Sequence, residues 1–151
     1  MFDSLLTLSP LLVLIGTLFS YIYTDNAIYL NFFILAGIFG WLANVIFKRT
    51  LEWLSNMSWV PPMPWIYRPN KNPAGHYCDS DRIGMPSGHA QFWAFTVVYW
   101  ALQTGQWPIV LIITAIMVDY SRVKVKCHNL LQIIVGSILG AGLAYSAVTI
   151  L

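Results

Sequence analysis

We expect an all-α, polytopic transmembrane bundle of about five membrane-spanning helices, with an interfacial loop between the second and third helices. Composition is one reason: hydrophobic residues make up 58% of the chain and charged residues only 9%, unlike a soluble domain. Charge distribution is the other, because residues 4–24, 26–47, 83–118 and 127–151 contain no Asp, Glu, Lys or Arg. Since about 20 residues cross a bilayer core, these ranges hold one, one, two and one spans.

The five predicted spans cover residues 5–23, 27–47, 89–103, 107–120 and 128–151. The first run is long enough for a signal peptide, but it lacks a basic start and a small-x-small cleavage site, so we interpret it as a span. The third and fourth spans are short, about 20 to 25 Å at 1.5 Å per residue. Either the bilayer is thin there, or their ends are recessed into the membrane around a water-filled pocket.

The last span carries a Gly136-x-x-x-Gly140 pattern and further small residues, Ala141, Gly142 and Ala144. Small residues let helices approach closely in a membrane. This face is therefore expected to pack against a helix of the same chain or against a second copy, which would make a homo-oligomer.

Residues 48–88 form the interfacial loop. Trp53, Trp59 and Trp65 suit the headgroup layer, and residues 51–54 could form a short amphipathic helix. The prolines at 61, 62 and 64 end any helix before Arg68.

With five spans, the N-terminus, the 48–88 loop and the 121–127 loop share one face of the membrane, which then holds all eight basic residues. The positive-inside rule makes this face cytoplasmic, whereas the glycosylation sequon at Asn56 would make it lumenal, so orientation stays open. The protein is expected in an endomembrane, such as that of the endoplasmic reticulum, or in another cell membrane. A net charge of +2 is too small to indicate nucleic acid as a partner.

Cys78 and Cys127 are the only cysteines, and they lie on this same face. Their spacing alone predicts neither a metal site nor a disulfide, so we expect two unpaired thiols and no bound metal.

Two stretches carry residues suited to phosphate chemistry. Ser87-Gly88-His89 opens an apolar helix, where backbone N–H groups, a hydroxyl and the positive end of the helix dipole favour an anion. Ser121-Arg122 is followed six residues after the arginine by His128. Two histidines and an arginine around one phosphate would supply a nucleophile, a proton donor and fixed positive charge.

These stretches resemble the type 2 phosphatidic acid phosphatase superfamily, whose motifs are a lysine before Arg-Pro, then Pro-Ser-Gly-His, then Ser-Arg with a later histidine. Here the motifs stand in that order as Arg68-Pro69, Pro86 to His89, and Ser121-Arg122 with His128. The chain looks most like the dolichyldiphosphatase-type branch, because His89-Ala90-Gln91-Phe92 follows the helix start and Gln132 stands where most relatives have aspartate.

The resemblance implies one phosphatase-like transmembrane domain over residues 1–151, with motifs within about 44–140. It implies an integral membrane lipid phosphatase that acts, without a cofactor or metal, on a polyisoprenyl diphosphate or a related lipid phosphate. His128 would be the nucleophile that becomes a phosphohistidine, and His89 the general acid and later base. Phosphate would be bound by Arg68, Arg122, Ser87 and Gly88.

Two residues depart from the family pattern. The family lysine would fall on Pro61, so we assign its role to Lys48, which follows the second span in an Asn44-x-x-x-Lys48 pattern. The alternative is that Lys48 is an ordinary lysine at the membrane interface. Gln132 can accept a hydrogen bond from His128 as an aspartate would, and so orient the nucleophile without the charge. A catalytically silent structural membrane protein and a small transporter subunit remain as competing interpretations.

Overall fold

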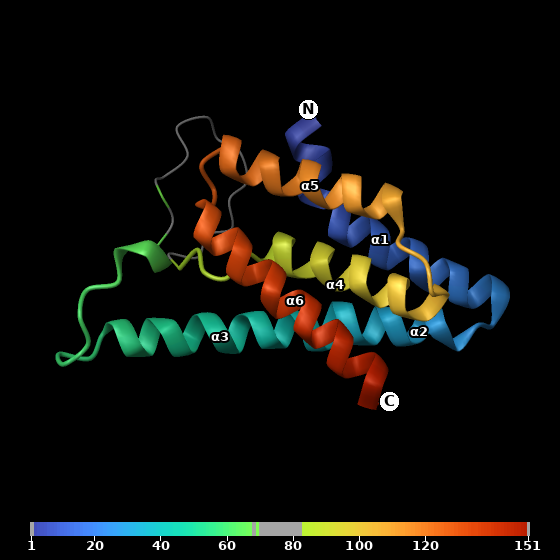
Figure 1. Ribbon diagram of the computed structural model, residues 1–151, viewed down its shortest axis with the longest axis horizontal. Helices are drawn as coiled ribbons and strands as arrows, with labels where there is room; N and C mark the ends of the chain where they lie inside the picture. The colour runs from blue at the N-terminus through green and yellow to red at the C-terminus, as the bar shows by residue number, and fades with distance from the viewer. Residues whose placement is uncertain (1, 68, 70–82, 151) are drawn as a thin grey trace.

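The computed structural model describes residues 2–67, 69 and 83–150. Over these residues the chain is helical and has no β-strand; a single isolated bridge pairs Tyr67 with Ile83. The predicted all-α class is confirmed. The elements in chain order are α1 (Phe2–Thr24), α2 (Ala27–Phe32), a π-helical segment η1 (Phe33–Phe39), α3 (Gly40–Ser55), a 3-10 turn η2 (Pro64–Ile66), α4 (Gly88–Thr104), α5 (Ile109–Lys124) and α6 (Leu130–Ile150) (Figure 1).

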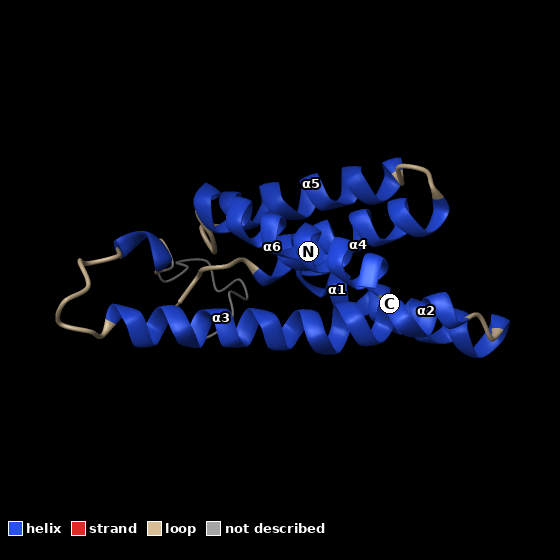
Figure 2. Cartoon of the chain, turned by 60° about the horizontal axis from the view of Figure 1, so that its bottom comes forward, coloured by secondary structure: helices blue, strands red, loops and turns tan. Residues whose placement is uncertain are grey.

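Three of the described helices are long and apolar enough to cross a membrane: Leu6–Thr24, Ala27–Ser55 and Leu130–Ile150. As predicted, α4 and α5 are shorter, with 17 and 16 residues, or about 25 Å each. Figure 2 shows α5 in one outer layer and α3 in the opposite one, with α4 between them. The arrangement is that of a helical membrane bundle.

The second predicted span is longer than expected. Because α2, η1 and α3 run on as one helix, it ends at Ser55 and not at residue 47, and residues 51–54 belong to it. No proline lies between Ala27 and Ser55, and Arg49 pairs with Glu52 one turn later at 3.0 Å.

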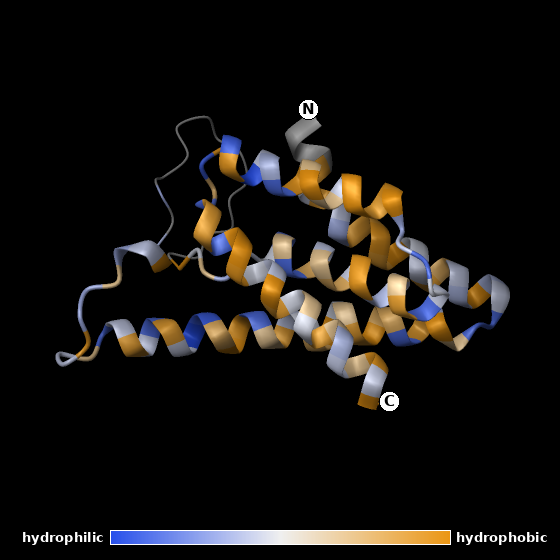
Figure 3. Cartoon of the chain, in the orientation of Figure 1, coloured by the Kyte–Doolittle hydropathy of each residue, from blue (hydrophilic) through white to orange (hydrophobic). Residues whose placement is uncertain are grey.

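The two ends of the bundle differ. Figure 1 shows the segment after α3, the start of α4 and the α5–α6 connection at one end, and the α1–α2 and α4–α5 turns at the other. Hydrophilic residues gather near these ends, while the helices are apolar along most of their length (Figure 3). The residues of the second and third motifs therefore lie at one end, as the predicted topology requires.

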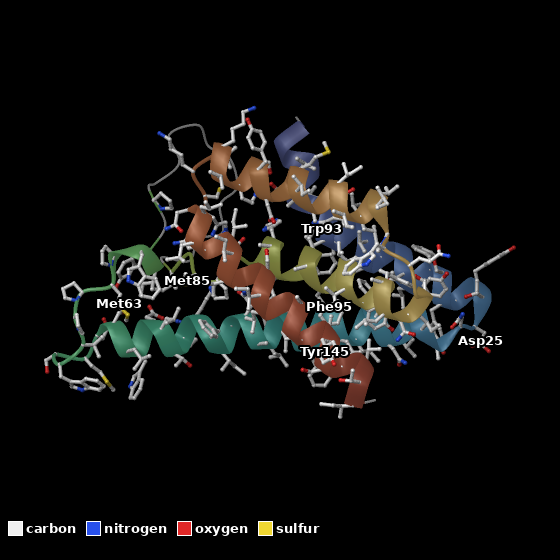
Figure 4. The ribbon with its side chains drawn as sticks, in the orientation of Figure 1. Asp25, Met63, Met85, Trp93, Phe95 and Tyr145 are labelled. Carbon is white, nitrogen blue, oxygen red and sulfur yellow. The ribbon has the colours of Figure 1, made fainter. Side chains whose placement is uncertain are left out.

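Helix α4 is the centre of the core. On one side Phe95 and Tyr99 pack with Phe32 of α2 and with α6. On another, Trp93 packs against Val118 of α5 and against α1 (Figure 4). A helix held from several directions fixes the position of whatever stands at its start.

Glycines bring α6 against α4. A Cβ on Gly136 would lie 2.5 Å from the Ser87 carbonyl oxygen, and one on Gly140 would overlap the Gln91 carbonyl. The small residues of α6 thus pack against a helix of the same chain, which was one of the two expectations. Pairing of α6 with a second copy stays a prediction.

The connection between α5 and α6 corrects two predicted boundaries. Ser121 and Arg122 are not in a loop, because α5 continues to Lys124 and the turn comes at Lys126, whose φ is +57°. Helix α6 begins at Leu130 and not at His128, since Asn129 and Gln132 form a capping box: Asn129 Oδ1 accepts from Gln132 N (2.9 Å), and Gln132 Oε1 accepts from Asn129 N (3.3 Å).

Candidate active site

The residues predicted to bind an anion stand at the start of α4, and we call this turn the anion seat, although its binding of an anion stays a prediction. Ser87 is the N-cap residue, fully buried, and its Oγ accepts a hydrogen bond from the Ala90 backbone N–H at 3.4 Å. The segment just before Ser87 is fixed as well, because the N–H groups of Gly84 and Met85 both donate to the Ile66 carbonyl. Gly88 and His89 form the exposed edge of the first turn, each partly accessible.

The seat is tied to the third motif through backbone. Ser87 N donates to the carbonyl of Gln132 in α6 at 3.0 Å. This bond is possible because Gly136, one turn further along α6, leaves room for the Ser87 backbone. The start of α4 and the first turn of α6 therefore hold one fixed position.

Arg122 is almost fully buried, with 2% of its surface exposed, at the last turn of α5. Its Nη2 donates to Thr7 Oγ1 of α1 at 2.7 Å, and its Nε donates to Ser121 Oγ at 3.3 Å. Its backbone carbonyl accepts from the N–H of His128 at 3.2 Å. The turn after α5 thus folds back and sets His128 against the arginine.

His128 has 3% of its surface exposed, and its Nδ1 lies 3.2 Å from Gln132 Oε1. The orientation of the glutamine amide is fixed on its other side, because Gln132 Nε2 donates to the carbonyls of Trp65 (3.0 Å) and Tyr67 (2.7 Å). Since an amide oxygen only accepts, Nδ1 carries the hydrogen of the neutral ring. Nε2 of His128 then carries the lone pair. This is the tautomer in which Nε2 can act as a nucleophile.

His89 is held by the same residue of α1 that binds Arg122. Its Nε2 lies 3.0 Å from the backbone carbonyl oxygen of Thr7, whose side chain accepts from Arg122. Sequence reasoning missed Thr7, because a threonine within an apolar span carries no signal of function. Its contacts with His89 and Arg122 arise only because α1 packs against α4 and α5.

A closed circuit of contacts joins the motif residues. His89 reaches Arg122 through Thr7, and Arg122 reaches His128 through its carbonyl. His128 reaches Gln132 through its ring, and Gln132 returns to Ser87 at the start of α4. Four separate helices contribute to this circuit: α1, α4, α5 and α6.

Lys48 lies on α3, beside this circuit. A cavity of about 550 Å³ between α1, the η1–α3 helix and α4 is lined by Lys48 together with Gly88 and His89. Lys48 therefore lines the same cavity as two of the other predicted site residues, Gly88 and His89.

Asn44 and Gln91 form a second buried network behind the seat. Asn44 Nδ2 donates to Gln91 Oε1 at 2.7 Å, and Gln91 Nε2 donates to the Gly40 carbonyl at 2.7 Å. Asn44 Nδ2 also approaches the Pro86 carbonyl at 3.5 Å. Asn44 of the Asn44-x-x-x-Lys48 pattern and Gln91 of the second motif are therefore hydrogen-bonded to each other.

Two further predictions concern Arg68 and the two cysteines. Arg68 lies outside the described residues, so its predicted place at the phosphate stays a prediction. The expectation of unpaired thiols is wrong for Cys127, which is buried beside His128 and disulfide-bonded; Cys78 lies outside the described residues.

Comparison with protein families gives a match to the PAP2 superfamily over residues 26–151. Neither the curated proteins nor the solved structures give a match. The family match includes every motif residue of the circuit but begins after α1, so Thr7 lies outside it.

Proposed function

Because the chain belongs to the PAP2 superfamily, we propose that it is an integral membrane lipid phosphatase that works through a phosphohistidine intermediate. Membership of the family supports phosphatase activity on lipid-like phosphates in general. The single observation that carries the more specific mechanism is the circuit of contacts through Thr7, Arg122, His128 and Gln132.

In the first step, His128 Nε2 attacks phosphorus and the bond from phosphorus to the leaving oxygen breaks. His89 gives its proton to that oxygen, which departs as an alcohol or, from a diphosphate, as a lipid monophosphate. A carbonyl only accepts, so His89 Nε2 carries a hydrogen in its contact with Thr7. We assign proton transfer to the other ring nitrogen, Nδ1.

In the second step, His89 takes a proton from water, which attacks the phosphohistidine and releases inorganic phosphate. Arg122 and Arg68 would neutralise the equatorial oxygens, and Ser87 and the Gly88 N–H would complete the cradle with Lys48. Preorganised donors of this kind contribute about 3 kcal/mol each to transition-state stabilisation.

We further propose a polyisoprenyl diphosphate of the dolichyl type, or a related lipid phosphate, as substrate. Support comes from Asn44, Gln91 and Gln132, which mark the resemblance to the dolichyldiphosphatase-type branch and lie in hydrogen-bonded networks around the seat. Gln132 does what an aspartate could not, because its amide nitrogen donates to two carbonyls while its oxygen faces His128.

The test is phosphate release by purified protein in detergent from a prenyl diphosphate and from phosphatidic acid. We expect turnover that vanadate inhibits and that a chelator leaves undiminished. No release from any lipid phosphate would favour the second candidate, a catalytically silent structural protein, for which Pro61 at the place of the family lysine is the supporting observation.

A further inference from the structure

The cavity beside His89 has a polar end and an apolar end. Lys48, Asn44 and His89 line it near the anion seat. Further along, its walls are Leu11 and Leu14 of α1, Ala36 and Gly37 of η1, and Phe92 and Phe95 of α4. From Lys48 back to Gly37 the helix rises about 16 Å, so the cavity is an elongated groove.

This groove is bridged at both ends. At the polar end, the Thr7 carbonyl of α1 contacts His89 Nε2 of α4 at 3.0 Å. At the apolar end, α1 approaches η1 so closely that a Cβ on Gly37 would lie 3.3 Å from Leu14 Cδ2. Contacts at both ends limit how far α1 can move away, so the groove is a slot of restricted width.

The slot opens toward the bilayer. Leu11 and Trp41 line it and yet have 54% and 62% of their surface exposed. Both belong to helices that are long and apolar enough to cross a membrane, so the space outside them is hydrocarbon. A molecule with one anionic end and one apolar end can enter from the side and meet Lys48 with its charge.

We propose that this slot binds the phosphate-proximal part of a single hydrocarbon chain of the lipid substrate, and so selects one-chain over two-chain lipid phosphates. The inference rests on the proposed function. Its volume of about 550 Å³ is in the range of about 300–1,000 Å³ typical of small-molecule pockets. The remainder of a long chain would leave between α1 and α3 into the bilayer.

The experiment compares dodecyl phosphate, butyl phosphate and dioleoyl phosphatidic acid at fixed mole fraction in mixed micelles. We expect kcat/KM for dodecyl phosphate to exceed that for butyl phosphate by about tenfold or more, because only the longer chain reaches the apolar end of the slot. Gly37→Leu fills the apolar end and should remove most of this preference. The matched control is Gly142→Leu on α6, where a Cβ meets nothing within 4 Å; it should keep the preference.

A second variant acts in the opposite direction. Leu14→Ala removes the apolar bridge and widens the slot, so activity on phosphatidic acid relative to dodecyl phosphate should rise about fivefold or more. If Gly37→Leu folds and keeps the chain-length preference, or if Leu14→Ala leaves the two-chain to one-chain ratio unchanged, the slot does not bind the chain.

Binding separates this inference from the proposed chemistry. Dodecyl phosphonate, which cannot be hydrolysed, should raise the Tm of the wild type, and Gly37→Leu should weaken its binding about tenfold. A wild type that hydrolyses nothing would contradict the proposed function while this binding difference still supports the slot. A phosphonate that binds both proteins equally would overturn the slot even if the enzyme is active.

Discussion

The two sides of α4 are packed in opposite ways. Toward α6 the helices meet at glycines, backbone against backbone, and Ser87 bonds directly to Gln132. Toward α1 and α3 the same helix borders a cavity of about 550 Å³. The close side fixes Gln132, which contacts His128, relative to the start of α4, and the open side leaves a cavity beside His89.

The largest effect should come from filling the close side. In Gly140→Val the new Cβ would overlap the Gln91 carbonyl, which cannot move without displacing α4. We expect a loss of about 3 kcal/mol or more of unfolding free energy and, with it, of activity. Thermal unfolding followed by circular dichroism measures this, with the lipid-facing Gly142→Val as control. A Gly140→Val protein with the wild-type Tm would show that the two helices are not in this contact.

His89 lies where the close and open sides meet. His89→Ala should lower kcat on a lipid phosphate by about 10² to 10⁴, because the leaving oxygen loses its proton donor. An aryl phosphate, whose leaving group needs less protonation, should suffer less in a side-by-side kcat measurement. Equal losses on the two substrates would indicate a binding role for His89.

Gln132 belongs to the close side and tests the orientation of the nucleophile. Gln132→Leu removes the acceptor for His128 Nδ1 and should reduce kcat about 100-fold. Gln132→Glu places a carboxylate beside the ring, which stabilises the imidazolium. Because attack requires the neutral ring, the acid limb of the pH–rate profile should move up by about one pH unit.

The pH–rate profile of Gln132→Glu distinguishes orientation from simple packing. An acid limb at the wild-type position, in a variant that still folds, would mean that position 132 does not contact His128 during turnover.

The smallest effect should come from the open side, at Thr7. Thr7→Val keeps the shape and the backbone carbonyl but removes the hydroxyl that holds Arg122, so vanadate should bind about tenfold more weakly. Thr7→Ser keeps the hydroxyl and should restore the inhibition constant. If the valine and serine variants behave alike, the hydroxyl does not position the arginine.

These sites also show what a sequence can predict. The all-α membrane class followed from the uncharged ranges, and the start of α4 followed from Ser87-Gly88, since both are local properties; that this turn binds an anion stays a prediction. The Asn129-x-x-Gln132 capping box is also a local signal, and it places the start of α6 at Leu130, two residues after the predicted start at His128. Nothing local marks Thr7, whose role depends on three helices meeting, and the nearness of Lys48 to His89 likewise depends on packing.

The most direct test of the proposed mechanism, in which His128 is the nucleophile, is to trap the phosphoenzyme. Wild-type protein mixed with a ³²P-labelled lipid phosphate and quenched in alkaline detergent should carry acid-labile label, as a phosphohistidine does. His128→Ala should fold and carry none, while His89→Ala, labelled from an aryl phosphate whose leaving group needs less protonation, should lose its label more slowly than the wild type. Label on folded His128→Ala equal to that on the wild type would contradict the assignment of His128 as the nucleophile.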